Sequence, residues 1–333
     1  MGYLKYLARH FIFPFALSVR ADKYLLKKTS KNCCILNFHG IRKGEHYFNN
    51  RHLHTTEFEK MIVYLKLNYA IVTLSELFEI HREKRKVKRR TIALTFDDGY
   101  ANNFDNAFPI LKKYNIPATF YIVSKSLVTD NYLLWPDVID LLKKYHKADI
   151  TINNHTFKYP SFYNAGLKTE LFRYLKGLGD QAELLTYSIL GENNYPEQEI
   201  KTAPELVQLI SSSNILKFVD EPLIEFGSHS HNHFNMEVLD RQTAENQLKQ
   251  SKEIIEKKIG KKVISFAFPD GSYKKATVEL AKEAGYKNIV AVEYRYNENN
   301  NNPNLLARFT VSNSSTYECN AIRLAKQFGS YGF

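Results

Sequence analysis

The chain has 333 residues, of which 44% are hydrophobic and 14% aromatic, enough to bury a large core. Its 46 Lys and Arg outnumber its 35 Asp and Glu, which gives a formal net charge of +11. The densest basic stretch, His81 to Arg90, holds seven Lys or Arg in ten residues, but it has no interleaved aromatics and matches no nucleic-acid-binding motif. We therefore expect no nucleic-acid partner, and a basic face that is solvated or that lies against an anionic membrane surface.

Residues 1–30 form a candidate amphipathic segment ahead of the main domain. The apolar run Phe11–Leu17 is interrupted by Pro14 and ends before Arg20, so it is too short for a transmembrane helix. No clear small-residue cleavage site follows it, which disfavours a signal peptide. The segment can dock on a membrane surface or pack on the rest of the chain, and the sequence leaves both open.

The cysteines do not form the pattern of a disulfide framework. Cys33 and Cys34 are adjacent and Cys319 stands alone. We expect a reducing, cytoplasmic location, with peripheral association at the inner face of the membrane as a further expectation. The oligomeric state is not predicted.

Residues 31–333 alternate between strand-like and helix-like runs, which predicts a single α/β barrel domain. In chain order, the strand-like runs include Ile35–Phe38, Ala70–Thr73, Thr91–Phe96 and Ile116–Val123. Helical patterns begin at Thr56 and cover Phe104–Tyr114. The alternation weakens between about residues 129 and 216, which predicts a helical insertion near the barrel mouth.

The first chemical motif is Thr95-Phe96-Asp97-Asp98-Gly99, directly after a strand-like run. Both carboxylates should lie at the C-terminal end of that strand, where α/β proteins hold their chemistry. A cation bound by one carboxylate leaves the other free to accept a proton. On its own, such a motif is most often a simple turn.

The second motif places His229 and His233 four residues apart, after the strand-like Phe226-Gly227-Ser228. Two imidazoles and one carboxylate with open positions match a catalytic metal site. In a chain with 11 His, this spacing can also arise by chance. The conjunction of both motifs favours the metal interpretation.

Together these motifs resemble the polysaccharide deacetylase (NodB-homology) family of carbohydrate esterases, over roughly residues 33 to 312. The resemblance implies a distorted (β/α) barrel, with Asp97 as catalytic base and Asp98, His229 and His233 as ligands of a divalent metal, zinc before cobalt or nickel. Ser265–Gly271 resembles the family's third motif, one wall of the substrate groove. The resemblance therefore implies substrate contacts by Phe268, Pro269 and Asp270.

Two departures from the family pattern concern the catalytic machinery. The Arg that pairs with the base in many members is replaced by Phe266 and Ala267, and Arg308 is the candidate substitute, against a plain surface salt bridge. The family's late His, which protonates the leaving group, is missing, since no His follows His233. His39, at the end of the first strand-like run, is the candidate general acid, against a loop His that only bonds backbone.

Two aromatic residues complete the candidate site. Tyr100 follows the first motif, where a turn exposes backbone donors for an oxyanion, and it is assigned to substrate binding. Trp135, in the predicted insertion, either stacks on a sugar ring or anchors the insertion to the barrel.

The expected function is a metal-dependent hydrolase that removes acetyl groups, N-acetyl before O-acetyl, from a saccharide or glycolipid in cell-surface polysaccharide metabolism. The alternatives are a catalytically silent glycan-binding barrel and a basic scaffold in a polysaccharide assembly complex. The sequence does not predict which acetylated sugar is the substrate.

Overall fold

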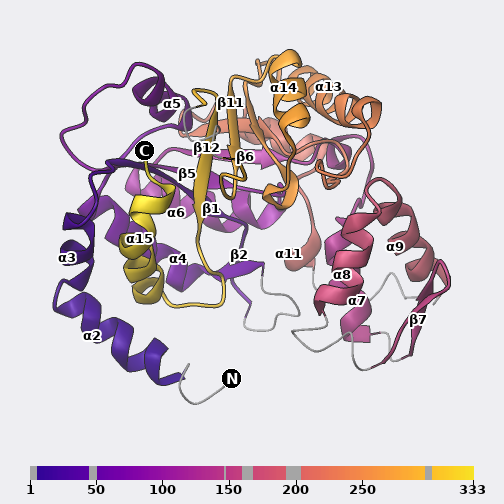
Figure 1. Cartoon of the computed structure of the whole chain (residues 1–333), viewed down its shortest axis with the longest axis horizontal. Helices are drawn as coiled ribbons and strands as arrows, with labels where there is room; N and C mark the ends of the chain where they lie inside the picture. The colour runs from indigo at the N-terminus through magenta and orange to yellow at the C-terminus, as the bar shows by residue number, and fades with distance from the viewer. Residues whose placement is uncertain (1–5, 45–50, 146–147, 160–167, 193–203, 297–301) are drawn as a thin grey trace.

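The structure is a computed structural model that describes residues 6–44, 51–145, 148–159, 168–192, 204–296 and 302–333 (Figure 1). Its centre is a barrel of parallel strands. In spatial order these are β1 (Cys33–Phe38), β12 (Leu305–Thr310), β11 (Asn288–Ala291), β10 (Ser265–Ala267), β9 (Ile224–Ser228), β6 (Ala118–Ile122) and β5 (Thr91–Phe96). β1 pairs with both β12 and β5, which closes the ring, and β4 (Ala70–Ile71) adds to β5. β9 and β10 share only the pair Ser228 and Phe266, so the barrel is distorted there, and the predicted fold class is confirmed.

Side chains of the barrel strands alternate between the barrel interior and the surrounding helices. In β1, Ile35 joins an inner apolar cluster with Ala93 of β5, whereas Leu36 joins the larger outer core. The next inward position of β1 is Asn37, which the strand register pairs with Thr95. The barrel interior therefore changes from apolar to polar near the C-terminal ends of the strands.

Helices cover the outside of the barrel, and one packs against its inner cluster. The outer helices are α4 (Thr55–Asn68), α6 (Phe108–Tyr114, after the π-helical turn η2 at Asn103–Ala107), α13 (Arg241–Ile259), α14 (Lys275–Glu283) and α15 (Tyr317–Tyr331). α5 (Leu74–Arg82) contributes its apolar face to the inner cluster. The helix predicted to open at Thr56 begins one residue earlier, because the His54 ring accepts the capping hydrogen bond from the Thr56 N–H.

Between β6 and β9 the chain leaves the barrel and forms a separate helical unit (Figure 1). Its elements are η3 (Ser124–Leu127), α7 (Trp135–Tyr145), the hairpin β7 (Ile150–Ile152) and β8 (His155–Phe157), α8 (Lys168–Gly177), α9 (Gln181–Glu192), α11 (Pro204–Val207), α12 (Ser212–Ile215) and η5 (Leu216–Phe218). The helices α7, α8 and α9 and the hairpin share an apolar cluster of their own. We call this unit, residues 124–218, the insertion.

The N-terminal segment forms η1 (Ala8–Ile12), α2 (Phe13–Ser18) and α3 (Ala21–Lys27), which lie beside α15 (Figure 1). Among the described residues, no helix combines the length and apolar character needed to cross a membrane. A short parallel pair, β2 (Gly40–Arg42) and β3 (His52–His54), follows β1, and the turn η6 (Pro269–Gly271) follows β10.

Candidate active site

The C-terminal ends of β1, β5, β9, β10 and β11 converge on one cavity of about 70 Å³. Its barrel side is lined by Asn37, His39, Asp97, Asp98, His229 and His233. Its other side is lined by Leu134, Pro136 and Phe172 of the insertion. The structure thus brings together residues that are nearly two hundred positions apart in the chain, because parallel strands direct their C-terminal ends to the same rim.

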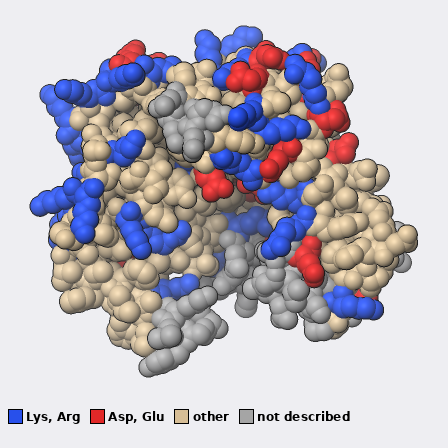
Figure 2. Space-filling model, viewed as in Figure 1, with Lys and Arg blue, Asp and Glu red and all other residues tan. Residues whose placement is uncertain are grey.

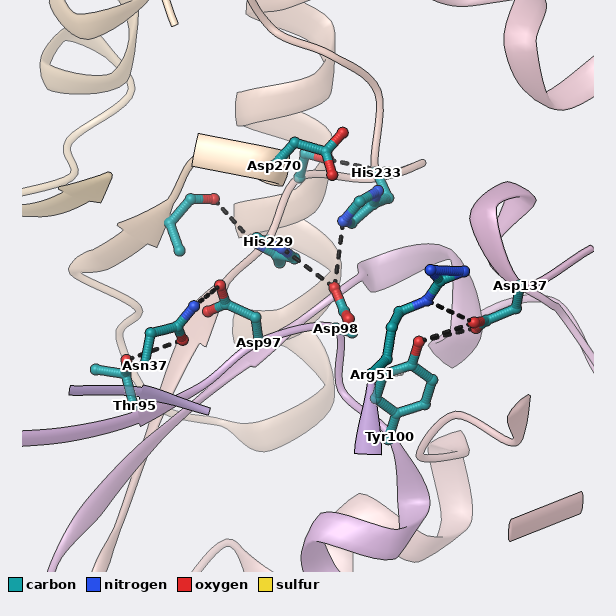
Figure 3. Close-up of polar contacts among 12 residues, drawn as sticks. Asn37, Arg51, Thr95, Asp97, Asp98, Tyr100, Asp137, His229, His233 and Asp270 are labelled. Carbon is teal, nitrogen blue, oxygen red and sulfur yellow. Dashed lines mark hydrogen bonds and ion pairs between the residues drawn. The ribbon is translucent and has the colours of Figure 1, made fainter. Parts of the chain in front are cut away.

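Asp98, His229 and His233 form a compact cluster at the cavity (Figure 3). One ligand atom from each lies within 4.8 Å of the others, and Nε2 of His229 and His233 lie 3.4 and 3.2 Å from Asp98 Oδ1. All three side chains are buried. Within the part of the chain that the structure describes, no other group of His, Cys, Asp or Glu has this geometry.

The hydrogen bond of His229 tests whether this cluster suits a metal. Its Nδ1 lies 2.9 Å from the Ala267 carbonyl oxygen, which can only accept, so Nδ1 carries the proton. In the neutral ring, Nε2 then presents a lone pair to the Asp98 carboxylate, an arrangement that needs a cation between them. The three side chains, with the Ala267 carbonyl orienting His229, therefore fit a divalent ion.

Asp97 is held by a buried bidentate ion pair with Arg308. Arg308 Nη1 donates to Asp97 Oδ1 and Nη2 donates to Oδ2, each at 2.7 Å, and the Arg308 side chain is 0% exposed. Burial raises the pKa of Asp97 and is the largest single influence, but the charge and hydrogen bonds of Arg308 and the nearby imidazoles together outweigh it, so the pKa lies below its usual value. The sequence left open that Arg308 makes only a surface salt bridge. The structure instead has Arg308 in a buried ion pair.

Two neutral residues complete this network from neighbouring strands. Asn37 Nδ2 donates to Asp97 Oδ2 at 3.0 Å, and Arg308 Nη1 donates to Asn37 Oδ1 at 3.0 Å and to Thr95 Oγ1 at 3.1 Å. Sequence reasoning missed Asn37. A polar residue inside the apolar run Cys33–Phe38 was the available signal, because a buried amide in a strand requires partners.

His39 lies where β1 ends and lines the same cavity as Asp97 and Asp98. Its Nδ1 is buried and has no hydrogen-bond partner among the described residues. The ring is therefore not occupied by the backbone hydrogen bond that the simple loop interpretation requires.

The third motif contributes Asp270 and Gly271 to the cavity. Asp270 lines it and lies 3.6 Å from the Lys176 ammonium of α8. Phe268 is 0% exposed and stacks on Tyr273 in the outer core, and Pro269 is also buried. The expectation that Phe268 and Pro269 form a groove wall is not met, because Ala267 faces the barrel interior and Phe268, the next residue, takes the outward-facing position.

The two predicted aromatic contacts lie behind the cavity wall. The Tyr100 hydroxyl donates to Asp137 Oδ2 at 2.9 Å, and the side chain is fully buried (Figure 3). The Trp135 indole N–H donates to the His233 carbonyl at 3.0 Å, and the ring stacks on Phe172. Trp135 has no exposed surface for a sugar ring and occupies the anchoring position that the sequence left open.

Arg51 is a cavity residue that sequence reasoning did not find. Its Nε lies 3.0 Å from Asp137 Oδ1 and its Nη2 lies 2.7 Å from Asp140 Oδ2, both on α7. Burial raises the pKa of Asp137 to about 6, against the opposing charge of Arg51. No local sequence motif indicates that Arg51 belongs to the site, because its partners lie more than 80 residues away.

Three site residues occupy the left-handed backbone region. φ is 73° at Asp98, 59° at His233 and 55° at Asp270. Such conformations cost roughly 1–3 kcal/mol each for residues other than glycine and persist where the surroundings enforce them. Gly271, next to Asp270, has φ of 64°, and a Cβ there would lie 2.5 Å from Val292. The rim therefore keeps unfavourable local geometry at the positions that face the cavity.

The family model for polysaccharide deacetylases matches residues 84–176 and 186–289 of this chain. The chain belongs to the polysaccharide deacetylase family. The matched segments contain Asp97, Asp98, His229, His233 and Asp270, whereas His39 and Arg308 lie outside them. In this deacetylase, the guanidinium that pairs with the first Asp comes from β12.

Two curated relatives are similar over a limited stretch. A poly-beta-1,6-N-acetyl-D-glucosamine N-deacetylase of Staphylococcus epidermidis is 32% identical over 120 residues, which cover 32% of this chain and 41% of that protein. The putative polysaccharide deacetylase YxkH of Bacillus subtilis is 31% identical over 123 residues, 37% of this chain and 41% of that protein. The similarity thus spans about two fifths of each relative.

Solved structures are similar in fold over most of the chain. The deacetylase PplD of Streptococcus pyogenes, in complex with acetate, aligns with a TM-score of 0.57 and 16% identity, covering 92% of this chain and 100% of that chain. IcaB of Ammonifex degensii aligns with a TM-score of 0.56 and 14% identity, covering 90% of this chain and 98% of that chain. At these identities the likeness concerns the barrel fold.

Proposed function

We propose that this deacetylase is a metal-dependent hydrolase that removes N-acetyl groups from a saccharide or glycolipid of cell-surface polysaccharide metabolism. The observation that carries the proposal is that two adjacent carboxylates line one cavity and have different partners. Asp97 is fixed by Arg308 and Asn37, and the adjacent Asp98 faces two imidazoles. Membership of the family and the barrel fold support the same conclusion.

Asp97 has the properties of a general base with one open position. A carboxylate offers about four lone-pair sites. Three of them accept from Arg308 Nη1, Arg308 Nη2 and Asn37 Nδ2. The remaining site can take the proton of a water in the cavity, and the bidentate guanidinium keeps the carboxylate ionised and correctly turned.

Asp98, His229 and His233 would hold the ion, and zinc is the first candidate, with cobalt or nickel as alternatives. The chemistry supplied there when a divalent ion is bound is polarisation of the acetyl carbonyl and acidification of water. The Ala267 carbonyl keeps Nε2 of His229 turned toward the cavity.

His39 is proposed as the group that gives a proton to the departing amine nitrogen. It lines the cavity, and no His after His233 is present to serve as the family's late acid. Its Nδ1 has no hydrogen-bond partner among the described residues. An amine leaves only when its nitrogen is protonated, so a positioned acid is required at this step.

The test is acetate release from a panel of N-acetylated oligosaccharides. Wild type would be compared with Asp97→Asn, with the exposed control Asp105→Asn, and with enzyme stripped of metal and reloaded with zinc or cobalt. We expect Asp97→Asn to lower the rate by roughly 10²–10⁴-fold. We expect stripping to abolish turnover and reloading to restore it, while Asp105→Asn behaves as wild type.

Metal content measured on the same samples separates the outcomes. Equimolar metal without turnover of any acetylated sugar would favour a barrel that binds glycans without hydrolysing them. Full activity in the stripped enzyme would refute the metal role of Asp98, His229 and His233.

A further inference from the structure

The N-terminal helices expose an apolar surface that the proposed deacetylase activity does not use. The stretch from Phe11 to Val19 contains no charged residue. Leu17 packs against the outer core, but Phe11 and Phe15 are 61% and 68% exposed. A helix that is apolar on all sides is normally buried on all sides. Here one side is covered by the described residues and the other faces solvent.

Neighbouring residues of α4 extend this surface. Of the 13 large hydrophobic residues that are exposed in the described parts of the chain, eight lie on the N-terminal helices or beside them on α4: Tyr6, Phe11, Ile12, Phe15, Val19, Tyr24, Val63 and Leu67. A groove of about 410 Å³ runs between α2, α4 and α15, and Leu17, Val63 and Leu67 are among its walls. We call these eight residues and the groove the apolar surface. Contiguous exposed apolar area of this kind marks an interaction site.

Cations flank the apolar surface along the N-terminal segment, and the acidic residue that lines the groove, Glu59 of α4, is paired with Lys113. Arg9, Arg20, Lys23, Lys27, Lys28 and Lys31 all come from the same short segment. The only acidic residue among residues 6–31 is Asp22, which is 1% exposed and accepts a hydrogen bond from the Tyr64 hydroxyl at 2.8 Å. In Figure 2, Lys and Arg stand out over α3 and uncharged residues cover α2.

The cations are close enough to repel one another. The pKa of Lys23 is lowered by partial burial and, against the attraction of Asp22, by the charges of Arg20, Arg90 and Arg89. An anionic partner would relieve this repulsion. The surface therefore combines exposed aromatic residues with a rim of unneutralised positive charge.

We propose that the apolar surface docks on an anionic phospholipid bilayer, with Phe11 and Phe15 entering the interface and the rim cations contacting headgroups. A second copy of this chain fits less well. A two-fold symmetric contact through this surface would place each copy's cations against those of its partner. The docking is independent of the chemistry at Asp97 and Asp98.

The test is co-sedimentation of the full chain with vesicles of phosphatidylcholine alone or of phosphatidylcholine with phosphatidylglycerol. Phe11→Ser/Phe15→Ser removes the apolar contact, and Leu184→Ser/Leu216→Ser is its control at two exposed apolar positions elsewhere. Lys27→Gln/Lys28→Gln removes two rim charges, and Lys257→Gln/Lys258→Gln on α13 is its control.

We expect binding to the anionic vesicles that weakens in high salt, because surface charge interactions are screened. Phe11→Ser/Phe15→Ser should weaken it at least tenfold, and Lys27→Gln/Lys28→Gln roughly 30-fold. The two control variants should bind as wild type. All four variants should keep the circular dichroism spectrum and acetate release of wild type on a soluble substrate.

Equal binding to neutral and anionic vesicles, or equal loss in a control variant, would overturn the proposal. Concentration-dependent dimerisation in sedimentation velocity, abolished by Phe11→Ser/Phe15→Ser while vesicle binding is absent, would assign the surface to a second copy of the chain instead. Loss of acetate release in Asp97→Asn leaves this result unaffected, so the two proposals fail separately.

Discussion

The barrel rim and the insertion meet at the same cavity but hold their residues in different ways. On the rim, Asp97, Asp98 and His229 follow the ends of barrel strands, and buried partners fix each of them. The insertion has an apolar cluster of its own and contacts the rim through both apolar and polar side chains. Its polar contacts include the Trp135 indole on the His233 carbonyl, Tyr100 and Arg51 on Asp137, and Lys176 beside Asp270.

This difference separates two kinds of task. The strand ends give the rim a geometry that is set by the whole barrel, which suits residues whose positions decide the rate of a reaction. The insertion supplies Leu134, Pro136 and Phe172 as a wall of the cavity. Changes at the rim should therefore affect turnover, and changes at the insertion should affect stability or substrate fit.

The largest effect on stability is expected for Arg308→Gln at the rim. Removing one partner of a buried ion pair leaves Asp97 without its counter-charge, which should lower the free energy of unfolding by about 3–5 kcal/mol. Loss of the fixed orientation of Asp97 should lower acetate release by about 100-fold. Urea denaturation and initial rates measure the two effects.

The control for Arg308→Gln is an exposed ion pair. Arg241→Gln on α13 breaks the contact with Glu283 and should change stability by less than about 1 kcal/mol. The double variant Asp97→Asn/Arg308→Gln should regain much of the lost stability, because no unpaired charge remains, without regaining activity. A stable and active Arg308→Gln enzyme would contradict the role of this pair.

A second rim change, His39→Gln, should affect the rate without affecting the fold. If His39 protonates the leaving amine, kcat should fall by roughly 10²–10⁴-fold while KM changes little. The cavity position has no described partner at Nδ1, so the substitution breaks no described hydrogen bond there. Steady-state kinetics on wild type, His39→Gln and the control His155→Gln in the hairpin measure the effect. An unchanged kcat would remove His39 from the mechanism.

The same contrast explains how far the sequence could predict this molecule. Thr91–Phe96 was predicted as a strand and is β5, because a buried parallel strand is a continuous apolar run with a clear end. The strand ends place Asp97, Asp98, His229 and His233 together once the barrel is assumed. The rim was therefore accessible from local pattern and family resemblance.

The residues that sequence reasoning missed depend on contacts across long separations. Asn37 and Arg51 gain their meaning from partners on other elements, Asp97 and Asp137, and neither has a local motif. Phe268 was expected at the groove, but it follows Ala267, which faces the barrel interior, and so lies on the same outward side as Phe266, in the core. A shift of one residue exchanges the two faces of a strand, and short sequence patterns do not fix that register.

The smallest effect is expected at the insertion, where Asp137 makes stability depend on pH. Its pKa is raised from 3.8 to about 6 in the folded chain, chiefly by burial. The folded state therefore holds this proton more tightly than the unfolded state. The stabilising contribution is full below about pH 3.8 and is lost as the pH rises through 6. Asp137→Asn cannot lose a proton and lacks this dependence.

We therefore expect the unfolding free energy of wild type, minus that of Asp137→Asn, to fall by at most roughly 3 kcal/mol between pH 4 and 7. Urea denaturation at steps across this range measures it, with Asp130→Asn as a control that removes the same charge from an exposed position. A difference that rises with pH would mean that the ion pair with Arg51 outweighs burial at Asp137. The sign of this slope thus decides which of the two effects dominates at this contact between the insertion and the rim.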